Sequence, residues 1–143
     1  MILALDLEGT LISNAMSQFP RHGLWHFLEL CNTHLPRTVL YTTVREPLAR
    51  SIAHTLVQEG SAPPWFSSIE YIEWSGAYKD LNFIKGYPEQ RTLLVDDNRD
   101  YIDPEQLHDW LLIDEFAYPY AEDHELQRVW AEICQRFQID AEW

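Results

Sequence analysis

The chain has 143 residues, with 23 acidic and 10 basic side chains and a formal net charge of -13. A chain of this length buries roughly two thirds of the surface that its unfolded form exposes, and 46% of its residues are apolar, so we expect one folded domain over residues 1–143 and exclude a disordered chain. The negative charge argues against nucleic acid and an anionic membrane surface as partners, because both would repel the protein.

Strand and helix patterns alternate in the first half of the chain. The apolar run at residues 2–7 ends before a glycine and a threonine, which is typical of a buried strand. Apolar residues in the segment 24–31 have the spacing of one helix face. Residues 39–42 have a second strand pattern, and the helix predicted after Pro47 carries an apolar stripe at Leu48, Ile52 and Leu56.

The alternation continues in the second half. Residues 69–74 predict a third strand, rich in β-branched and aromatic residues, and residues 79–85 a short helix. Strands are predicted at 92–95 and 110–113, and the stripe within 126–137 predicts the last helix. Strands that alternate with helices indicate an α/β fold of three Rossmann-like layers, with a central parallel sheet of about five strands and helices on both faces.

The cysteines and the N-terminus suggest a compartment. Cys31 and Cys134 each lie in an apolar helical pattern, as expected of small core residues in a reducing environment. The apolar run at the N-terminus is too short and uncharged for a signal peptide, and no run approaches membrane length. We therefore expect a cytoplasmic protein without a membrane partner, and either a monomer or an oligomer.

Polar residues gather where the predicted strands end. In open α/β sheets the ligand site lies at the carboxyl ends of the strands. The residues at these positions are Asp6, Glu8, Gly9 and Thr10 after the first strand, Thr42 and Thr43 after the second, and Asp96 and Asp97 after the fourth, with Lys79 preceding the fourth. Acids after two buried strands, together with hydroxyls and a lysine, suggest metal-assisted phosphoryl transfer.

Single residues of this set have simpler explanations. Asp96 and Asp97 alone would be typical of a solvated turn that opens a helix, and Lys79 alone of a surface lysine. Glu8 has the alternative of an ordinary loop carboxylate. Asp6 is different, because an unpaired charge at the end of a buried strand is costly. The combination of these residues therefore carries the functional interpretation.

The set resembles the four motifs of the haloacid dehalogenase (HAD) superfamily. These are a nucleophilic Asp in Asp-x-Asp-Gly-Thr, a Thr or Ser that ends the second strand, a Lys, and a final acidic pair, and the chain has them in this order. Within the superfamily the chain is most similar to the NLI-interacting-factor-like branch, the RNA polymerase C-terminal-domain phosphatases. That similarity covers the segments 21–28, 39–42, 78–81, 94–97 and 123–126.

The resemblance implies a Mg²⁺ site and a phosphatase of the HAD type. Asp6 would be the nucleophile that forms an aspartyl-phosphate, and it would also bind the metal. Asp97 is the first choice for the second ligand, and Asp96 would bind the metal through water or orient the site. Asp100 is either a further site acid or a residue that opens a helix. The backbone carbonyl of Glu8 would complete the ligand set.

The resemblance also assigns the residues that hold the substrate. Thr42 and Lys79 would bind the oxygens of the transferring phosphoryl group. Gly9, Thr10 and Thr43 would lie beside the substrate.

Glu8 departs from the usual motif, in which the second acid is Asp. That acid protonates the leaving group and then activates the hydrolytic water. The longer Glu side chain must fold back, or the substrate must sit differently. Enolase-phosphatase members of the superfamily carry Asp-x-Glu-Gly-Thr, so the resemblance leaves the acid–base role of Glu8 open.

The intervals between the motifs hold no cap domain, since each has room for little more than one helix. Uncapped members of the superfamily often act on large substrates or borrow a lid from another subunit. We expect a phosphoric monoester hydrolase acting on a phosphoprotein or another accessible phosphoester, and the acidic surface favours a basic peptide around the phosphate. The alternatives are a small-metabolite or nucleotide phosphatase of the same fold, and a non-catalytic interaction module in which Glu8 has disabled turnover.

Overall fold

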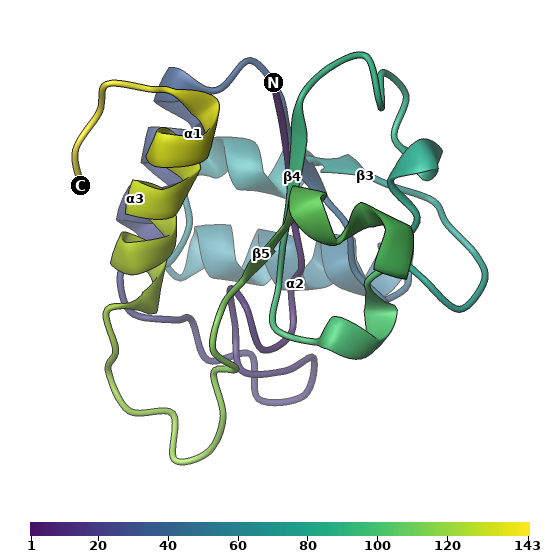
Figure 1. Ribbon diagram of the computed structural model, residues 1–143. Coiled ribbons are helices and arrows are strands. Elements are labelled where there is room, and N and C mark those ends of the chain that lie inside the picture. The colour runs from purple at the N-terminus through teal and green to yellow at the C-terminus, as the bar shows by residue number, and fades with distance from the viewer.

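A parallel five-stranded sheet forms the centre of the computed structural model, which describes residues 1–143 (Figure 1). The strand order is β3-β2-β1-β4-β5. The strands are β1 (Ile2–Leu5), β2 (Thr38–Leu40), β3 (Glu70–Tyr71), β4 (Thr92–Asp96) and β5 (Trp110–Leu112). The side chains of β1 and β4 are buried throughout, as their continuous apolar runs predict for strands covered on both faces. This confirms the predicted α/β fold.

Three α-helices cover one face of the sheet. They are α1 (Leu24–His34), α2 (Glu46–Gln58) and α3 (Glu125–Phe137). Their buried residues join Leu3, Leu5 and Val95 of the sheet in one apolar cluster. Figure 1 shows α1 and α2 behind the sheet, with α3 beside α1.

The opposite face is covered by short 3₁₀-helices and the turns between them. Ala4 and Leu94 of the sheet pack there against Leu81, Ile84 and Ile102. The 3₁₀-helices on this side are η2 (Leu81–Phe83), η3 (Arg99–Tyr101) and η4 (Pro104–Asp109), and a further one, η1 (Pro64–Ser68), contacts α2. Helical layers thus lie on both sides, but only one contains α-helices, and no cap domain covers the sheet.

Apart from shifts of one or two residues at strand ends, three predictions differ from the structure. The third strand spans two residues rather than 69–74, because only Glu70 and Tyr71 pair with β2. The helix predicted over 79–85 is the single turn η2, whose N-terminus is capped by the side chain of Asp80. Leu48 is 46% exposed, because the buried stripe of α2 begins one residue later, at Ala49.

The strand order places the candidate site. The chain adds β2 and β3 on one side of β1 and then crosses to the other side for β4 and β5. The carboxyl ends of β1 and β4 therefore lie next to each other where the strand order reverses, the usual position of a ligand site in such sheets.

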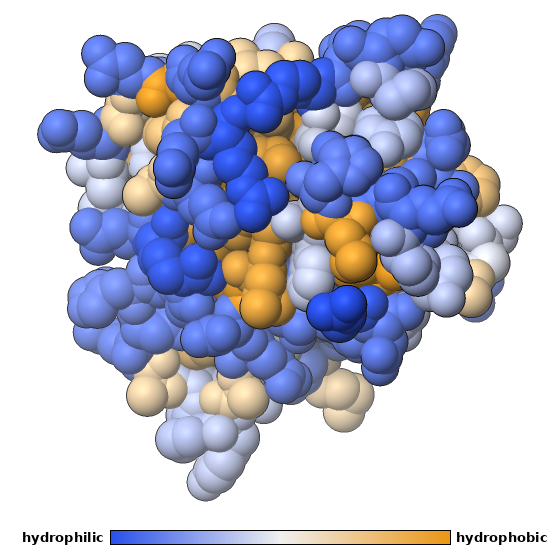
Figure 2. Space-filling model, in the orientation of Figure 1, coloured by the Kyte–Doolittle hydropathy of each residue, from blue (hydrophilic) through white to orange (hydrophobic).

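One side of the molecule is mainly hydrophilic. In Figure 2, polar residues cover most of the side seen in Figure 1, with small apolar patches among them. None of the helices combines the length and the apolar character that a membrane span requires.

Candidate active site

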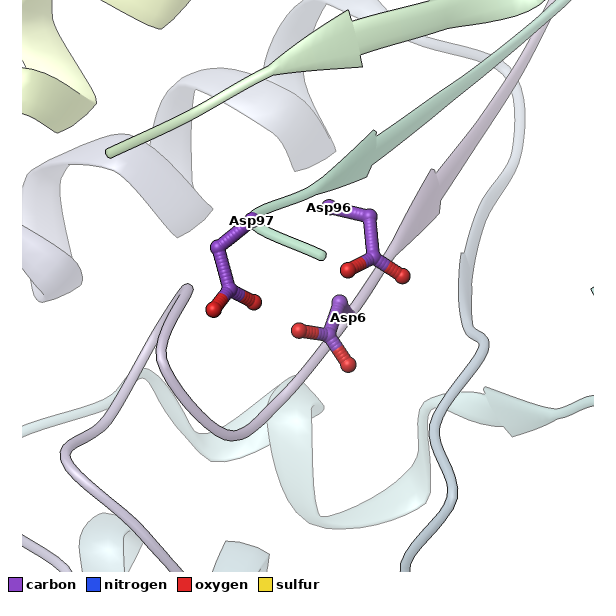
Figure 3. Close-up of side chains that lie close together, drawn as sticks. All are labelled: Asp6, Asp96 and Asp97. Atoms are coloured by element: carbon purple, nitrogen blue, oxygen red, sulfur yellow. The ribbon is translucent and has the colours of Figure 1, made fainter. Parts of the chain in front are cut away.

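Three aspartates meet at the carboxyl ends of β1 and β4 (Figure 3). Asp6 follows β1, Asp96 is the last residue of β4, and Asp97 comes next. One carboxylate oxygen from each lies within 4.8 Å of the other two. Asp6 and Asp96 are buried, and Asp97 is half-buried. The structure thus brings together acids that are about ninety residues apart in the sequence.

Lys79 is buried against two of these acids. Its Nζ donates to Oδ1 of Asp6 at 2.9 Å and to Oδ2 of Asp96 at 2.5 Å, and its side chain is 1% exposed. If all three aspartates are ionised, one ammonium group leaves two negative charges unbalanced. A divalent cation would therefore balance the charge of the site.

Burial opposes the ionisation of this cluster. It raises the pKa of Asp6 to about 7, although the charge of Lys79 acts in the opposite direction. Burial and the charge of Asp6 raise the pKa of Asp96 to about 6, and burial also raises that of Asp97. Burial alone would lower the pKa of Lys79, but the charges of Asp6 and Asp96 outweigh it and raise that pKa.

This donor set fits Mg²⁺. The ion prefers carboxylate oxygens and water, and it commonly uses one or two protein carboxylates together with a substrate phosphate. Burial raises the pKa values of Asp6 and Asp96 even though Lys79 lies beside both carboxylates, so the ionised cluster is costly without further positive charge. A bound divalent cation would supply it.

The loop after β1 requires glycine at position 9. Gly9 has a φ of +74°, and a Cβ there would lie 2.5 Å from Oδ2 of Asp97. The next residue, Thr10, is fully buried between two of the acids. Its hydroxyl lies 2.9 Å from Oδ2 of Asp6 and 3.3 Å from Oδ1 of Asp97, so it can orient either carboxylate.

A buried arginine holds this loop in place. Arg21 donates through Nη1 to the backbone carbonyls of Gly9 and Thr10, at 3.1 and 3.2 Å. Its Nε contacts both carboxylate oxygens of Asp123, and its Nη2 donates to the carbonyl of Asp114. The segments 21–28 and 123–126, noted above only for their family resemblance, thus meet behind the site loop.

Glu8 lies in the same pocket but outside the group of three aspartates. Its Oε2 accepts a hydrogen bond from the backbone N–H of Ala15 at 2.7 Å. Both Glu8 and the aspartates line a pocket of about 300 Å³. The carboxylate of Glu8 thus contacts the loop that follows it.

The two threonines after β2 have different environments. Thr42 is buried, and its Oγ1 accepts a hydrogen bond from the N–H of Val44 at 3.0 Å. Thr43 is exposed and lines the pocket together with Asp6 and Lys79. Thr42 instead lines a neighbouring groove.

Some residues that line the pocket were not predicted as site residues. Asp100, which was considered as a site acid, does not line the pocket. Asp100 is exposed in the first turn of η3, outside the group of aspartates. The unpredicted lining residues come from irregular segments without a periodic pattern: Ser13, Asn14, Asn98, Tyr101 and Glu115. Asn98 and Tyr101 follow the acidic pair closely, so their position just after β4 is the feature of the sequence that could have indicated them as site residues.

Comparison with known proteins gives a family. No match is found among the curated proteins. A family model described as NLI interacting factor-like phosphatase matches residues 1–139. The match includes the loop after β1, the end of β2, Lys79 and the acids after β4. The chain therefore belongs to the NLI interacting factor-like phosphatases, a family of the HAD-like phosphatase branch.

Proposed function

We propose that this protein is a Mg²⁺-dependent phosphoric monoester hydrolase that works through an aspartyl-phosphate on Asp6, within a single HAD-like domain. The main support is the convergence of Asp6, Asp96 and Asp97, the first two of which contact one buried lysine, inside a chain of a phosphatase family. A carboxylate attacks a phosphate dianion only where positive charge offsets the repulsion between them.

Asp6 is the proposed nucleophile. Hydrogen bonds from Lys79 to Oδ1 and from Thr10 to Oδ2 restrict the carboxylate to one orientation, which favours attack. A bond forms between an oxygen of Asp6 and phosphorus while the bond to the leaving oxygen breaks. Water then attacks phosphorus, which releases phosphate and regenerates the carboxylate.

The phosphoryl oxygens need donors in the transition state. Lys79 supplies an ammonium group, and the threonines after β2 supply hydroxyl groups. The hydroxyl proton of Thr42 is free to donate, because Oγ1 acts as an acceptor toward Val44. Thr43 is the threonine that lines the pocket around Asp6.

Asp6, Asp96 and Asp97 would hold the magnesium ion, with the carbonyl of Glu8 as a further ligand. When bound, Mg²⁺ supplies the positive charge that brings the phosphate dianion and the carboxylate together. Removal of the metal with EDTA is expected to abolish phosphate release from p-nitrophenyl phosphate, and added Mg²⁺ to restore it.

The concentration of Mg²⁺ that gives half of the full rate should fall as the pH rises. Asp6 and Asp96, with pKa values of about 7 and about 6, must lose their protons before they bind the ion. The effect is measured by titrating the reaction rate with Mg²⁺ at several pH values, some between the two pKa values and some above both. Full activity in EDTA, or the same half-saturating concentration throughout, would refute the metal assignment.

Glu8 is the proposed acid and base. It protonates the leaving oxygen in the first step and takes a proton from water in the second. Glu8→Gln should slow hydrolysis of an alkyl phosphate by about 10²- to 10⁴-fold, the usual range for loss of general acid–base catalysis. With p-nitrophenyl phosphate, whose leaving group departs without a proton, the variant should instead show a rapid burst of nitrophenol followed by slow turnover.

The matched control is Glu8→Asp, which keeps a carboxylate and restores the usual motif, but has one methylene less with which to reach Ala15. We expect it to retain more alkyl phosphatase activity than Glu8→Gln. Wild-type rates with both substrates in Glu8→Gln would mean that Glu8 is an ordinary loop carboxylate.

The proposed substrate is a phosphorylated protein segment. The pocket is open to solvent without a cap domain, so the phosphate of a large substrate can reach Asp6. The excess of acidic side chains favours a segment with basic residues.

A further inference from the structure

A second groove continues from the phosphate pocket. Its volume is about 710 Å³, and it lies between the end of β2, the start of α2 and the segment after β3. Thr43 and Tyr101 line both the groove and the pocket that contains Asp6. The groove therefore adjoins the pocket, within reach of a group attached to a phosphate bound there.

Aromatic side chains with fixed positions form the wall of the groove. The indole Nε1 of Trp74 donates to the carbonyl of Thr42 at 2.8 Å, and the hydroxyl of Tyr71 donates to the carbonyl of Val44 at 2.6 Å. The ring of Tyr101 stands at 84° to that of Trp74, with 6.2 Å between centroids. The backbone after β2 thus holds two of the rings, so the groove is formed before a substrate binds.

Two glutamates, Glu46 and Glu73, and one arginine line the groove. Glu73 is exposed and has no ion pair, and Glu46 contacts only Arg50, at 3.4 Å. Burial raises the pKa of Tyr71, and the charges of Glu73 and Glu46 raise it further. Arg45 is the one basic residue that lines the groove, and it pairs with neither glutamate.

We propose that this groove binds an arginine or lysine side chain of a phosphoprotein substrate, close in sequence to the phosphorylated residue. A cation over Trp74 and Tyr71 is attracted to their ring faces, and Glu73 balances its charge. The ring of Tyr101 already contacts Nζ of Lys79, which lies 5.5 Å from its centroid. An acidic side chain at the same place would be repelled by Glu73 and Glu46. The inference rests on the proposed phosphatase function and names the kind of peptide that the enzyme selects.

A set of phosphoserine peptides tests this specificity. One arginine is moved through the positions on either side of phosphoserine in an alanine-rich peptide, and matched peptides carry alanine or glutamate there. For the best position, wild-type kcat/KM should be about 3- to 10-fold higher with arginine than with alanine, and lowest with glutamate. In Glu73→Gln, the ratio of kcat/KM for the arginine peptide to kcat/KM for the alanine peptide should fall to nearly one.

Glu89→Gln is the matched control. It removes the same charge from an exposed residue of the loop before β4, at the amino end of the strands. Glu89→Gln should keep the wild-type ratio of kcat/KM between the arginine and alanine peptides. If Glu73→Gln and Glu89→Gln lower this ratio equally, net charge rather than the groove selects the peptide. Arg45→Gln should leave the preference for arginine in place.

The outcomes separate this inference from the proposed function. Asp6-dependent hydrolysis of p-nitrophenyl phosphate without a preference for arginine would overturn the groove assignment alone. A preference for the glutamate peptide that disappears in Arg45→Gln would overturn it too, because the groove would then bind anions. Failure of the wild type to hydrolyse any of these phosphoesters with Mg²⁺ would overturn both.

Discussion

Asp6→Asn should lower kcat for p-nitrophenyl phosphate by about 10³-fold or more, because it removes the proposed nucleophile. The amide has nearly the same shape as the carboxylate and keeps an oxygen toward Lys79. Lys79 also retains its contact with Asp96. The loss of activity should therefore occur in a folded protein, which circular dichroism and thermal unfolding can establish.

Trapping of the intermediate makes the assignment specific. Wild-type enzyme quenched in acid during turnover of a labelled phosphoester should carry label on Asp6, and Asp6→Asn should carry none. Asp100→Asn is a useful control, because it removes an exposed acid outside the group of aspartates. Comparable turnover in wild type and Asp6→Asn would exclude the aspartyl-phosphate mechanism.

The sequence was sufficient to predict the elements that carry the central acids. β1 and β4 are buried on both faces, so they appear as continuous apolar runs followed by polar residues. Parallel strands place those polar residues at one edge of the sheet, which is why Asp6, Asp96 and Asp97 could be grouped before their positions were known.

Segments whose structure depends on tertiary contacts were predicted less well from the sequence. The segment 69–74 has good strand composition, yet only the two residues that reach β2 form strand pairs. Trp74 leaves the sheet to line the groove, and its indole binds the carbonyl of Thr42, a contact that local propensity does not encode. Glu115 enters the pocket from an irregular segment before α3, where no periodicity marks it.

The environment of Lys79 was also beyond prediction from its neighbours in sequence. It lies before the single turn η2, in a segment that resembles an exposed loop or short helix. Its complete burial follows from two carboxylates that come from β1 and β4. A lysine is buried in this way only where partners offset the cost of removing its charge from water.

Lys79→Met should therefore affect both activity and folding. The variant loses the donor for the phosphoryl group, so turnover should fall to the background of the assay. It also leaves Asp6 and Asp96 buried without their cation. Breaking a buried ion pair typically costs about 3–5 kcal/mol, and we expect a loss of this size in the free energy of unfolding of metal-free protein at about pH 8.

The loss of stability should depend on pH in a defined direction. The folded-state pKa values of Asp6 and Asp96, about 7 and about 6, exceed the ordinary value of 3.8, so folding favours their protonated forms. Both acids therefore lower stability as the pH rises from about 4 to about 7. Loss of Lys79 removes an opposing charge and raises both pKa values further. The deficit of the variant should then be largest above about pH 7 and shrink in acid, where both aspartates are protonated.

Urea unfolding of wild type and Lys79→Met in acid and at about pH 8, with and without Mg²⁺, measures this dependence. Mg²⁺ should restore part of the stability of the variant at the higher pH, because it replaces positive charge beside the aspartates. Lys85→Met is the matched control, since Lys85 is exposed and its side chain forms no ion pair. Lys79→Met could instead prove as stable as the control in metal-free protein at about pH 8. The buried lysine would then not balance the charges of the aspartates, and the charge deficit inferred for the metal site would be wrong.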